Sequence, residues 1–213
     1  KNYYNGQFNN IENTPSIPED TGILDMLGTL FSVHEDNRPK SEIPHIKTDL
    51  KKLSESNDNY YIWFGHSSYL IQISGVKYLI DPVFSGSVSP APGSGKAFRG
   101  ADYYDVEMLP EKIDYLIITH DHYDHLDYDT VKKLKDMVGK VIVPLGVGEH
   151  FEYWGYSPEK IIELSWDEEN HLEENVKIIS VPSRHASGRL FPLNNTLWTS
   201  YILYVDGKKI FLG

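Results

Sequence analysis

Three histidines and three aspartates lie within one short segment, His120-Asp121-His122-Tyr123-Asp124-His125-Leu126-Asp127. The residues before it, 113–118, are mainly apolar and three of the six are isoleucine, which predicts a buried strand. After it, apolar residues recur at helical spacing, at Val131, Leu134 and Val138. Asp127 is the expected N-cap of this helix, and Gly139 its expected end. The cluster therefore lies on a loop that leaves a strand and enters a helix.

The spacing of these side chains suits metal binding. His120 and His122 are two residues apart in an extended segment, so their rings point to the same side. Beyond a turn of the chain, Asp124 and His125 can face a second point nearby. Neutral imidazoles and carboxylates are ligands for zinc, iron or manganese. A solvated polar loop would explain a single histidine, but the clustering favours a metal site.

The pattern His120-x-His122-x-Asp124-His125 after an apolar strand resembles the metal-binding signature of the metallo-β-lactamase superfamily. The resemblance implies two divalent metal ions, expected to be zinc, with manganese or iron as alternatives. It assigns His120 and His122 to one ion, and Asp124 and His125 to the other. A histidine on a later loop completes the first site in this superfamily, and His185, which follows a predicted strand, matches it.

The resemblance also implies roles for residues outside the cluster. An aspartate at the position of Asp81 holds the metal loop in this superfamily rather than binding metal, as carboxylates beside metal ligands do. Arg189 and Ser187 follow the third histidine and could contact a phosphate oxygen; an exposed surface charge is the alternative for Arg189. His66 could line the active site or form a hydrogen bond at a strand end. We expect no metal ligand among the remaining histidines, His34, His45, His150 and His171.

The fold implied by the resemblance is α/β, an αββα sandwich with helices outside two facing sheets. Residues 59–213 would form the first half of this hydrolase domain, incomplete at the C-terminus, and residues 1–58 an N-terminal extension. The bridging aspartate and last histidine of the superfamily would lie beyond Gly213. A further segment or another chain, such as a second copy, would supply the other half, because a sheet with one uncovered face should not be stable alone. The chain begins with Lys1, so we expect a processed or truncated N-terminus.

Local patterns predict the elements that position the cluster. Hairpin turns are expected at Ser74-Gly75 and Asp206-Gly207. Further strands are expected over 60–64, 68–73, 76–80, 141–144, 160–164, 176–181, 198–205 and 208–212. Helices are expected over 148–154 and 22–31, the second packed on the domain or touching lipid. The long loop 84–107 is rich in Ser, Gly and Pro and is expected to bind substrate through Phe98, Arg99, Tyr103 and Tyr104.

Several segments resemble the N-acylphosphatidylethanolamine-hydrolysing phospholipase D group and its bacterial relatives. They include Gly65-His66-Ser67-Ser68, Asp81-Pro82-Val83-Phe84-Ser85, Glu163-Leu164-Ser165-Trp166 and Pro182-Ser183-Arg184-His185. The resemblance implies hydrolysis of a small or lipid phosphodiester by a hydroxide held between two metal ions about 3.5–4 Å apart. The alternatives are a lactonase of the ascorbate-phosphate lactonase type and a non-catalytic metal-binding protein.

Composition narrows the possible partners. The formal net charge is −11, which opposes nucleic-acid binding because such binding needs basic surface. The absence of cysteine excludes disulfides and thiolate metal ligands. No apolar run reaches about 18 residues, so we expect no transmembrane segment. A cytoplasmic location, a membrane-associated one and a homo-oligomeric state all remain open.

Overall fold

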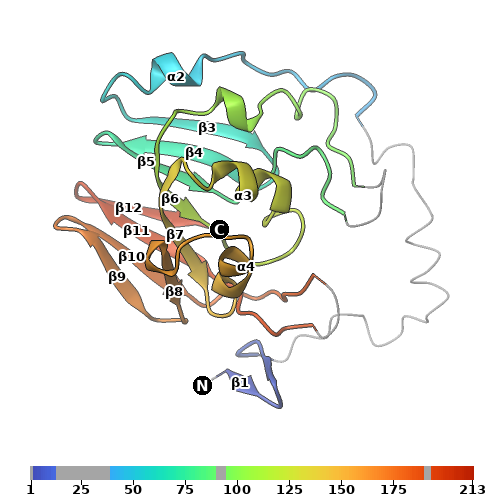
Figure 1. Cartoon of the computed structure of the whole chain (residues 1–213), viewed down its shortest axis with the longest axis vertical. Helices are drawn as coiled ribbons and strands as arrows, with labels where there is room; N and C mark the ends of the chain where they lie inside the picture. Colours follow the sequence, from blue (N-terminus) through green and yellow to red (C-terminus); the bar gives the residue numbers. More distant parts are fainter. Residues whose placement is uncertain (1, 13–38, 90–94, 190–192) are drawn as a thin grey trace.

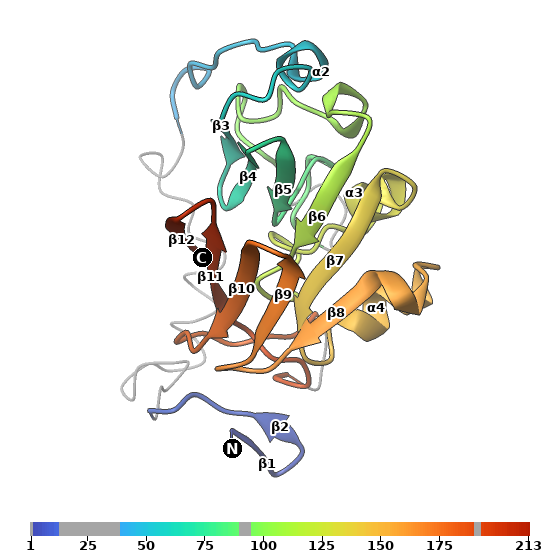
Figure 2. The same ribbon diagram turned by 90° about the vertical axis from the view of Figure 1, so that its left-hand side faces the viewer.

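Two β-sheets lie face to face in the computed structural model, which describes residues 2–12, 39–89, 95–189 and 193–213 (Figures 1 and 2). Apolar side chains from both sheets share one buried cluster, to which Tyr78 and Ile117 of the first sheet and Tyr201 and Leu203 of the second belong. A second buried cluster lies between the first sheet and the helices. The described residues therefore form three layers: helices, a six-stranded sheet and a four-stranded sheet.

The six-stranded sheet has the order β3-β4-β5-β6-β7-β8. Its strands are β3 (Tyr60–Gly65), β4 (Ser68–Ile73), β5 (Val76–Ile80), β6 (Ile113–Ile117), β7 (Val138–Pro144) and β8 (Ile161–Leu164). The first three strands are antiparallel, and β5 to β8 are parallel. The predicted turn at Ser74-Gly75 is confirmed: both residues have positive φ, as a two-residue hairpin of the common type requires.

The four-stranded sheet has the order β12-β11-β10-β9 and is antiparallel throughout. Its strands are β9 (Glu169–Glu173), β10 (Val176–Val181), β11 (Ser200–Val205) and β12 (Lys208–Leu212). The hairpin at Asp206-Gly207 is confirmed. The sequence did not predict β9, because its residues are mostly polar and exposed and it pairs only along one edge.

The helices lie on the outer face of the six-stranded sheet (Figure 1). They are α2 (Leu50–Leu53), α3 (Tyr128–Leu134) and α4 (Gly148–Tyr153), with 3₁₀ turns η2 (Val106–Met108) and η3 (Pro158–Lys160). Each α-helix contributes a buried apolar residue to this layer: Leu50, Val131, Leu134 and Phe151. The predicted helix over 22–31 lies outside the described residues.

The helix after the metal loop is shorter than the sequence predicts. Val138 and Gly139 belong to β7 and not to the end of α3, because Val138 pairs with Ile113 in the parallel sheet. Gly139 is needed there for a close approach: a Cβ at this position would lie 2.8 Å from the carbonyl oxygen of Asp114. Val138 therefore has the spacing of a helix residue, but it is a strand residue whose side chain faces the same core.

The described parts of residues 1–58, the predicted N-terminal extension, pack against the rest of the domain. Leu50 is buried in the helix-side core, and Phe8 is buried against Leu197 and Trp198. Phe8 belongs to a small hairpin of β1 (Tyr3–Tyr4) and β2 (Gln7–Phe8), near the bottom of Figure 2. No helix among the described residues is long and apolar enough to span a membrane.

Ile117 is fully buried in the contact between the two sheets. Shortening its side chain should therefore have a large effect on stability. We expect Ile117→Ala to lower the free energy of unfolding by about 2–5 kcal/mol, since it removes buried methyl groups and leaves a cavity. The matched control is Ile46→Ala, because Ile46 is 83% exposed. Urea unfolding followed by circular dichroism measures both, and equal losses would contradict this packing.

Candidate metal centre

The histidine-rich loop follows β6 and is anchored at its base. Ile118 donates its backbone N–H to Ile142 of β7, and Thr199 donates to the carbonyl of Thr119. The chain then turns, with both His125 and Leu126 donating to the carbonyl of His122. The loop therefore starts inside the sandwich and turns back within a few residues, which brings its side chains to one sheet edge.

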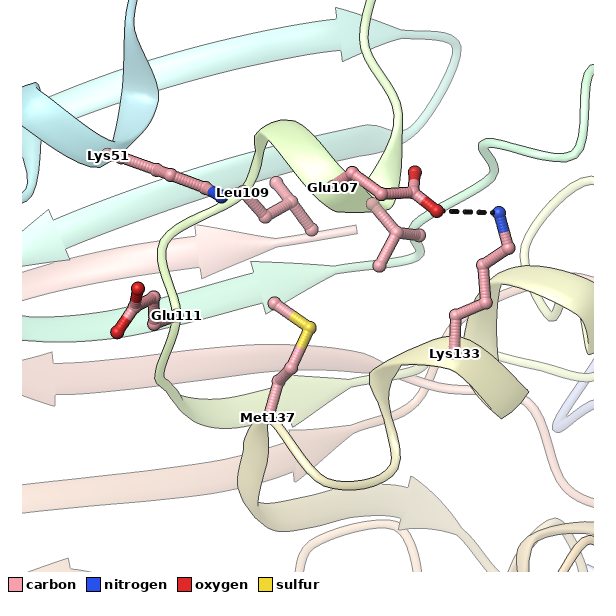
Figure 3. Close-up of a pocket in the computed structure, with 7 residues that line it drawn as sticks. Lys51, Glu107, Leu109, Glu111, Lys133 and Met137 are labelled. Carbon is pink, nitrogen blue, oxygen red and sulfur yellow. Dashed lines mark hydrogen bonds and ion pairs between the residues drawn. The ribbon is translucent and has the colours of Figure 1, made fainter.

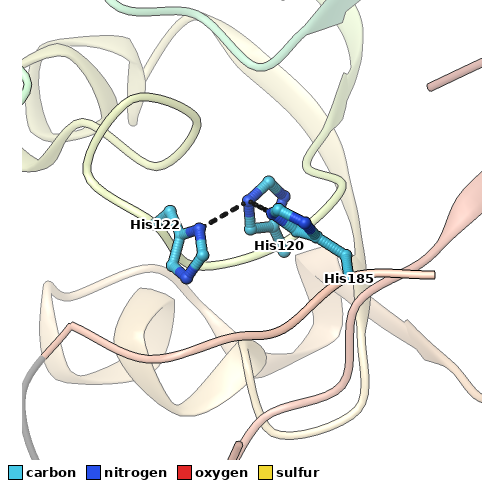
Figure 4. A group of neighbouring side chains, drawn as sticks. All are labelled: His120, His122 and His185. Carbon is cyan, nitrogen blue, oxygen red and sulfur yellow. Dashed lines mark hydrogen bonds between the residues drawn. The ribbon is translucent and has the colours of Figure 1, made fainter. Parts of the chain in front are cut away.

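Three imidazoles converge at this edge, those of His120, His122 and His185 (Figure 4). His120 Nε2 lies 3.0 Å from His122 Nδ1 and 3.0 Å from His185 Nε2. His120 and His122 come from the loop after β6, and His185 comes from the loop after β10. The structure thus brings together the three histidines assigned by resemblance to one ion.

The electrostatics of this group favour neutral rings. Burial lowers the pKa of His120, and the neighbouring imidazoles lower it further. Burial also lowers the pKa of His122 and of His185. Because metals bind the deprotonated ring nitrogen, these rings have the protonation state that a metal ion needs. The donor set fits zinc, and equally iron or manganese.

A second group lies beside the first and consists of His66, Asp124 and His125. His66 Nε2 lies 3.1 Å from Asp124 Oδ2 and 3.3 Å from His125 Nε2. The sequence left His66 open between an active-site residue and a strand-end hydrogen bond. His66 lies on the turn between β3 and β4. The structure places its ring against Asp124 and His125, the two residues assigned to the second ion.

Asp81 is fully buried directly after β5 and contacts the second group through His125. Its carboxylate accepts hydrogen bonds from the Thr119 backbone N–H at 2.8 Å and from the Thr119 hydroxyl at 2.7 Å. It also lies 2.8 Å from His125 Nδ1. Burial lowers the pKa of His125, but the hydrogen bond with Asp81 and the negative charges of Asp81 and Asp124 together outweigh it, so the pKa lies above its usual value. This contact leaves His125 Nε2 facing Asp124.

Arg189 fastens the loop after β10 to the metal loop. Its Nη1 donates to the backbone carbonyls of Asp121 and Leu126, and its guanidinium lies 4.0 Å from the centroid of the Tyr123 ring. Arg189 also borders a pocket of about 220 Å³ beside the metal loop. Ser187, in contrast, is buried and donates its hydroxyl to the carbonyl of Thr196, so it does not point toward a substrate.

The N-terminal hairpin holds the loop of His185 through Asn10. The Asn10 side chain donates to the carbonyl of His185 at 2.8 Å and accepts from the backbone N–H of His185 at 3.1 Å. Phe8 donates its backbone N–H to the carbonyl of Asn194 at 2.8 Å. Sequence reasoning missed Asn10, because nothing local connects it to a residue 175 positions away.

The long loop predicted to bind substrate packs mostly against the segment before α2. Tyr104 donates its hydroxyl to the carbonyl of Ile46, and Ile43 donates to the carbonyl of Arg99. At the end of this loop, η2 borders a surface pocket of about 500 Å³, where Glu107 pairs with Lys133 at 3.1 Å (Figure 3). None of the clustered histidines lines it. The clustered histidines do not line the pocket beside the metal loop either, but Tyr123 and Asp127 of that loop do, so it is the better candidate for a substrate.

Comparison with known proteins supports the resemblance to the metallo-β-lactamase superfamily. A family model described as the β-lactamase superfamily domain matches residues 77–213. The chain belongs to the metallo-β-lactamase superfamily. This membership also confirms the predicted fold class, an α/β fold of the metallo-β-lactamase type.

Relatives of this metallo-β-lactamase superfamily chain are longer than the chain itself. An uncharacterized protein of Mycobacterium tuberculosis is 34% identical over 214 residues, which cover 100% of this chain and 57% of that protein. The N-acyl-phosphatidylethanolamine-hydrolyzing phospholipase D 1 of Caenorhabditis elegans is 29% identical over 158 residues, 70% of this chain and 44% of that protein. The crystal structure of CmlA, a diiron beta-hydroxylase from Streptomyces venezuelae, matches with a TM-score of 0.53 and 25% identity, over 73% of this chain and 29% of that chain.

The contact between Asn10 and His185 predicts that the N-terminal hairpin affects metal affinity. We expect Asn10→Ala to weaken the binding of Zn²⁺ at the three-histidine group by about tenfold, because the backbone of His185 loses its two hydrogen bonds with the Asn10 side chain. Titration of metal-free protein against a chromophoric chelator measures this. Asn57→Ala, at an exposed asparagine elsewhere, is the control. Equal affinities of the two variants would contradict a role for Asn10.

Proposed function

We propose that the protein is a metal-dependent hydrolase with two metal ions, and that its substrate is a phosphodiester. The observation that carries this proposal is the pairing of two ligand groups at one edge of the sheets. His120, His122 and His185 form one group, and Asp124 and His125 belong to the other. The rings of His120 and His125 also lie tilted against each other with their centroids 4.0 Å apart, so the two groups are direct neighbours.

The chemistry of the two groups fits this reaction class. Two ions at such sites would lower the pKa of bound water from 15.7 toward about 7 and would neutralise charge on phosphoryl oxygens. The residues around them have separate tasks. The imidazoles and Asp124 would hold the ions, Asp81 fixes His125 in place, and Arg189 holds the loop. Zinc is the expected metal, and the likeness to a diiron protein keeps iron as an alternative.

The substrate class rests on charge and on relatives. The chain carries a net charge of −11, so a pair of cations would be a local positive site on an acidic protein. Such a site attracts an anionic group of a small molecule or lipid, whereas the acidic surface repels a nucleic acid. Arg189 borders the adjacent pocket and could contact a phosphate oxygen there with its remaining donors. The phospholipase D relative supports a lipid phosphodiester.

We also propose that a further segment or a second chain covers the outer face of the four-stranded sheet. Ile202 and Phe211 are paired neighbours on that face, and Phe211 is 67% exposed. Every described α-helix contributes to the core on the other side of the six-stranded sheet. A covered face would complete the fourth layer of the sandwich. The chain spans 57% of its mycobacterial relative, which leaves room for such a segment.

The proposal predicts two transition-metal ions per chain and hydrolysis that depends on both. We expect Asp124→Asn to keep the fold but to weaken the second ion, because a carboxylate ligand becomes a neutral amide. The turnover number should then fall by at least about 100-fold, while His171→Ala should change it little, since His171 is exposed on β9. The natural full-length protein, loaded with zinc, manganese or iron, is assayed for metal content and for activity.

The substrates in this assay separate the candidate functions. They are N-acylphosphatidylethanolamine, bis-p-nitrophenyl phosphate and a sugar-acid lactone. Turnover of the lactone alone would replace the phosphodiesterase proposal by a lactonase. Full activity of Asp124→Asn would contradict a two-ion mechanism. Two bound ions without turnover of any substrate would count against the phosphodiesterase proposal and favour a non-catalytic metal-binding protein.

A further inference from the structure

Asp121 is a buried carboxylate inside the metal loop. It lies between His120 and His122, and its side chain is only 4% exposed. Removing a carboxylate from water is costly unless neighbouring groups compensate its charge. Two groups from outside the loop face it. The backbone N–H of Gly188 donates to Oδ1 at 2.6 Å, and Nε2 of His150 lies 3.6 Å from Oδ2. Each carboxylate oxygen therefore has a partner from a different element.

The contact with Gly188 joins the metal loop to the loop after β10. Gly188 follows His185 by three residues in that loop, and Arg189 donates to the backbone carbonyl of Asp121 at 3.2 Å. A hydrogen bond from a backbone N–H to a carboxylate is charge-assisted, and so it is stronger than one between neutral groups. The ring of His185 faces that of His120 across these two loops (Figure 4). Their relative position therefore depends on where the Asp121 carboxylate points.

His150 is held on a well-anchored helix beside this carboxylate. It belongs to α4, whose residue Phe151 is fully buried in the helix-side core. The His150 ring stacks on Trp154, one turn later, with 5.6 Å between centroids and an interplanar angle of 22°. The side chain of Glu163 accepts from the backbone N–H of Gly148, the first residue of α4, at 2.8 Å. These contacts fix the direction in which the imidazole of His150 points.

The contact between His150 and Asp121 differs from an exposed ion pair. Exposed pairs contribute little, because water screens both charges. Here the carboxylate is enclosed, although the His150 side chain is 32% exposed. Within the described part of the chain, no other basic side chain forms an ion pair with Asp121, so removing the imidazole leaves a buried oxygen without that partner. Asp81 and His125 form the corresponding pair beside the second ligand group.

We propose that His150 is a positioning residue for the first metal ion, the one that the three-histidine group would hold, and that it acts through Asp121. The imidazole holds the Asp121 carboxylate in the orientation that receives the N–H of Gly188. This hydrogen bond in turn keeps His185 beside the other two histidines. The inference assigns no ligand role to His150. It rests on the proposed function only in assuming a metal ion at the three histidines, and it requires no particular substrate.

The test removes the imidazole and then restores its donor. Alanine and glutamine both suit a helix, and the glutamine amide offers an N–H near the position of the lost Nε2. We expect His150→Ala to bind the first Zn²⁺ about tenfold more weakly, and His150→Gln to stay within about threefold of the wild type. Competition with a chromophoric chelator measures this in the full-length protein, and again in an Asp124→Asn background that should keep only the first ion. Glu152→Ala is the matched control, because it shortens an exposed side chain on the same helix.

Spectra of the Co²⁺-loaded proteins separate positioning from folding. The visible bands of Co²⁺ report the arrangement of its ligands, so they should change in His150→Ala and return in His150→Gln. The thermal midpoint of the metal-free protein reports the fold. A lower midpoint in His150→Ala with unchanged affinity and unchanged bands would show a purely structural role and overturn the proposal. Equal losses of affinity in both variants would also overturn it, because packing on Trp154 and not the contact with Asp121 would then be responsible.

A double-mutant cycle tests the route through Asp121. In Asp121→Asn the amide oxygen can still accept from Gly188, but the charge that faces His150 is lost. Adding His150→Ala to Asp121→Asn should weaken the first ion no further, because both changes break one contact. Additive losses would overturn the route. A wild-type protein without an ion at the three histidines would overturn this proposal and the proposed function together. Two bound ions without turnover would remove only the hydrolase, since the affinities still decide the role of His150.

Discussion

The arrangement of the candidate metal centre depends on one buried carboxylate, that of Asp81. It receives the backbone N–H and the hydroxyl of Thr119, and it contacts Nδ1 of His125. Because the Thr119 hydroxyl donates to Asp81, its oxygen can accept from His120 Nδ1, which lies 2.9 Å away. His120 and His125 then both carry a proton on Nδ1, which turns their Nε2 atoms toward the other side chains of their groups. One side chain thus sets the tautomer of one imidazole in each ligand group.

The metal loop is held from several directions by residues far apart in the sequence. Asp127 accepts hydrogen bonds from the backbone of Phe84 and Ser85, which ties the loop to the segment after β5. On the other side, Asp121 accepts from Gly188, and Arg189 donates to the loop's carbonyls. A group of ligands whose geometry exists before the ion arrives loses less conformational freedom on binding, which favours affinity. These hydrogen bonds hold the metal loop in one conformation, although the loop contains no long helix or strand.

Much of this architecture could be predicted from local sequence, and the failures have physical causes. Strands such as β4 and β5 are apolar runs with a glycine turn between them, so their pattern and their structure agree. The histidine-rich loop was found because its ligands lie close together in the chain. Val138 was misassigned because an apolar residue that follows a helix has the same spacing whether the helix continues or a strand begins. The edge strand β9 has almost no apolar signal.

The contacts that sequence could not reveal are the long-range ones. Asn10 pairs with the backbone of His185, and the local sequence around either residue gives no indication of this. His66 could be recognised as a histidine at a strand end, but its partners could not, because they depend on the order in which β3, β4, β5 and β6 lie in the sheet. Local patterns therefore identify candidate ligands, whereas the sheet order decides which of them meet.

The two ligand groups differ in burial, and this difference bears on their chemistry. His120 is buried at the base of the loop, whereas Asp124 and His66 reach the surface. An ion among His120, His122 and His185 would have only neutral ligands, so its charge would depend on nearby carboxylates for compensation. Asp121 could serve this purpose: burial raises its pKa, but His150, Gly188 and Thr196 together lower it below its usual value. The outer group has its own carboxylate and faces solvent, so an ion held there would be open to exchange with solvent, whereas one held by the inner group would be more enclosed.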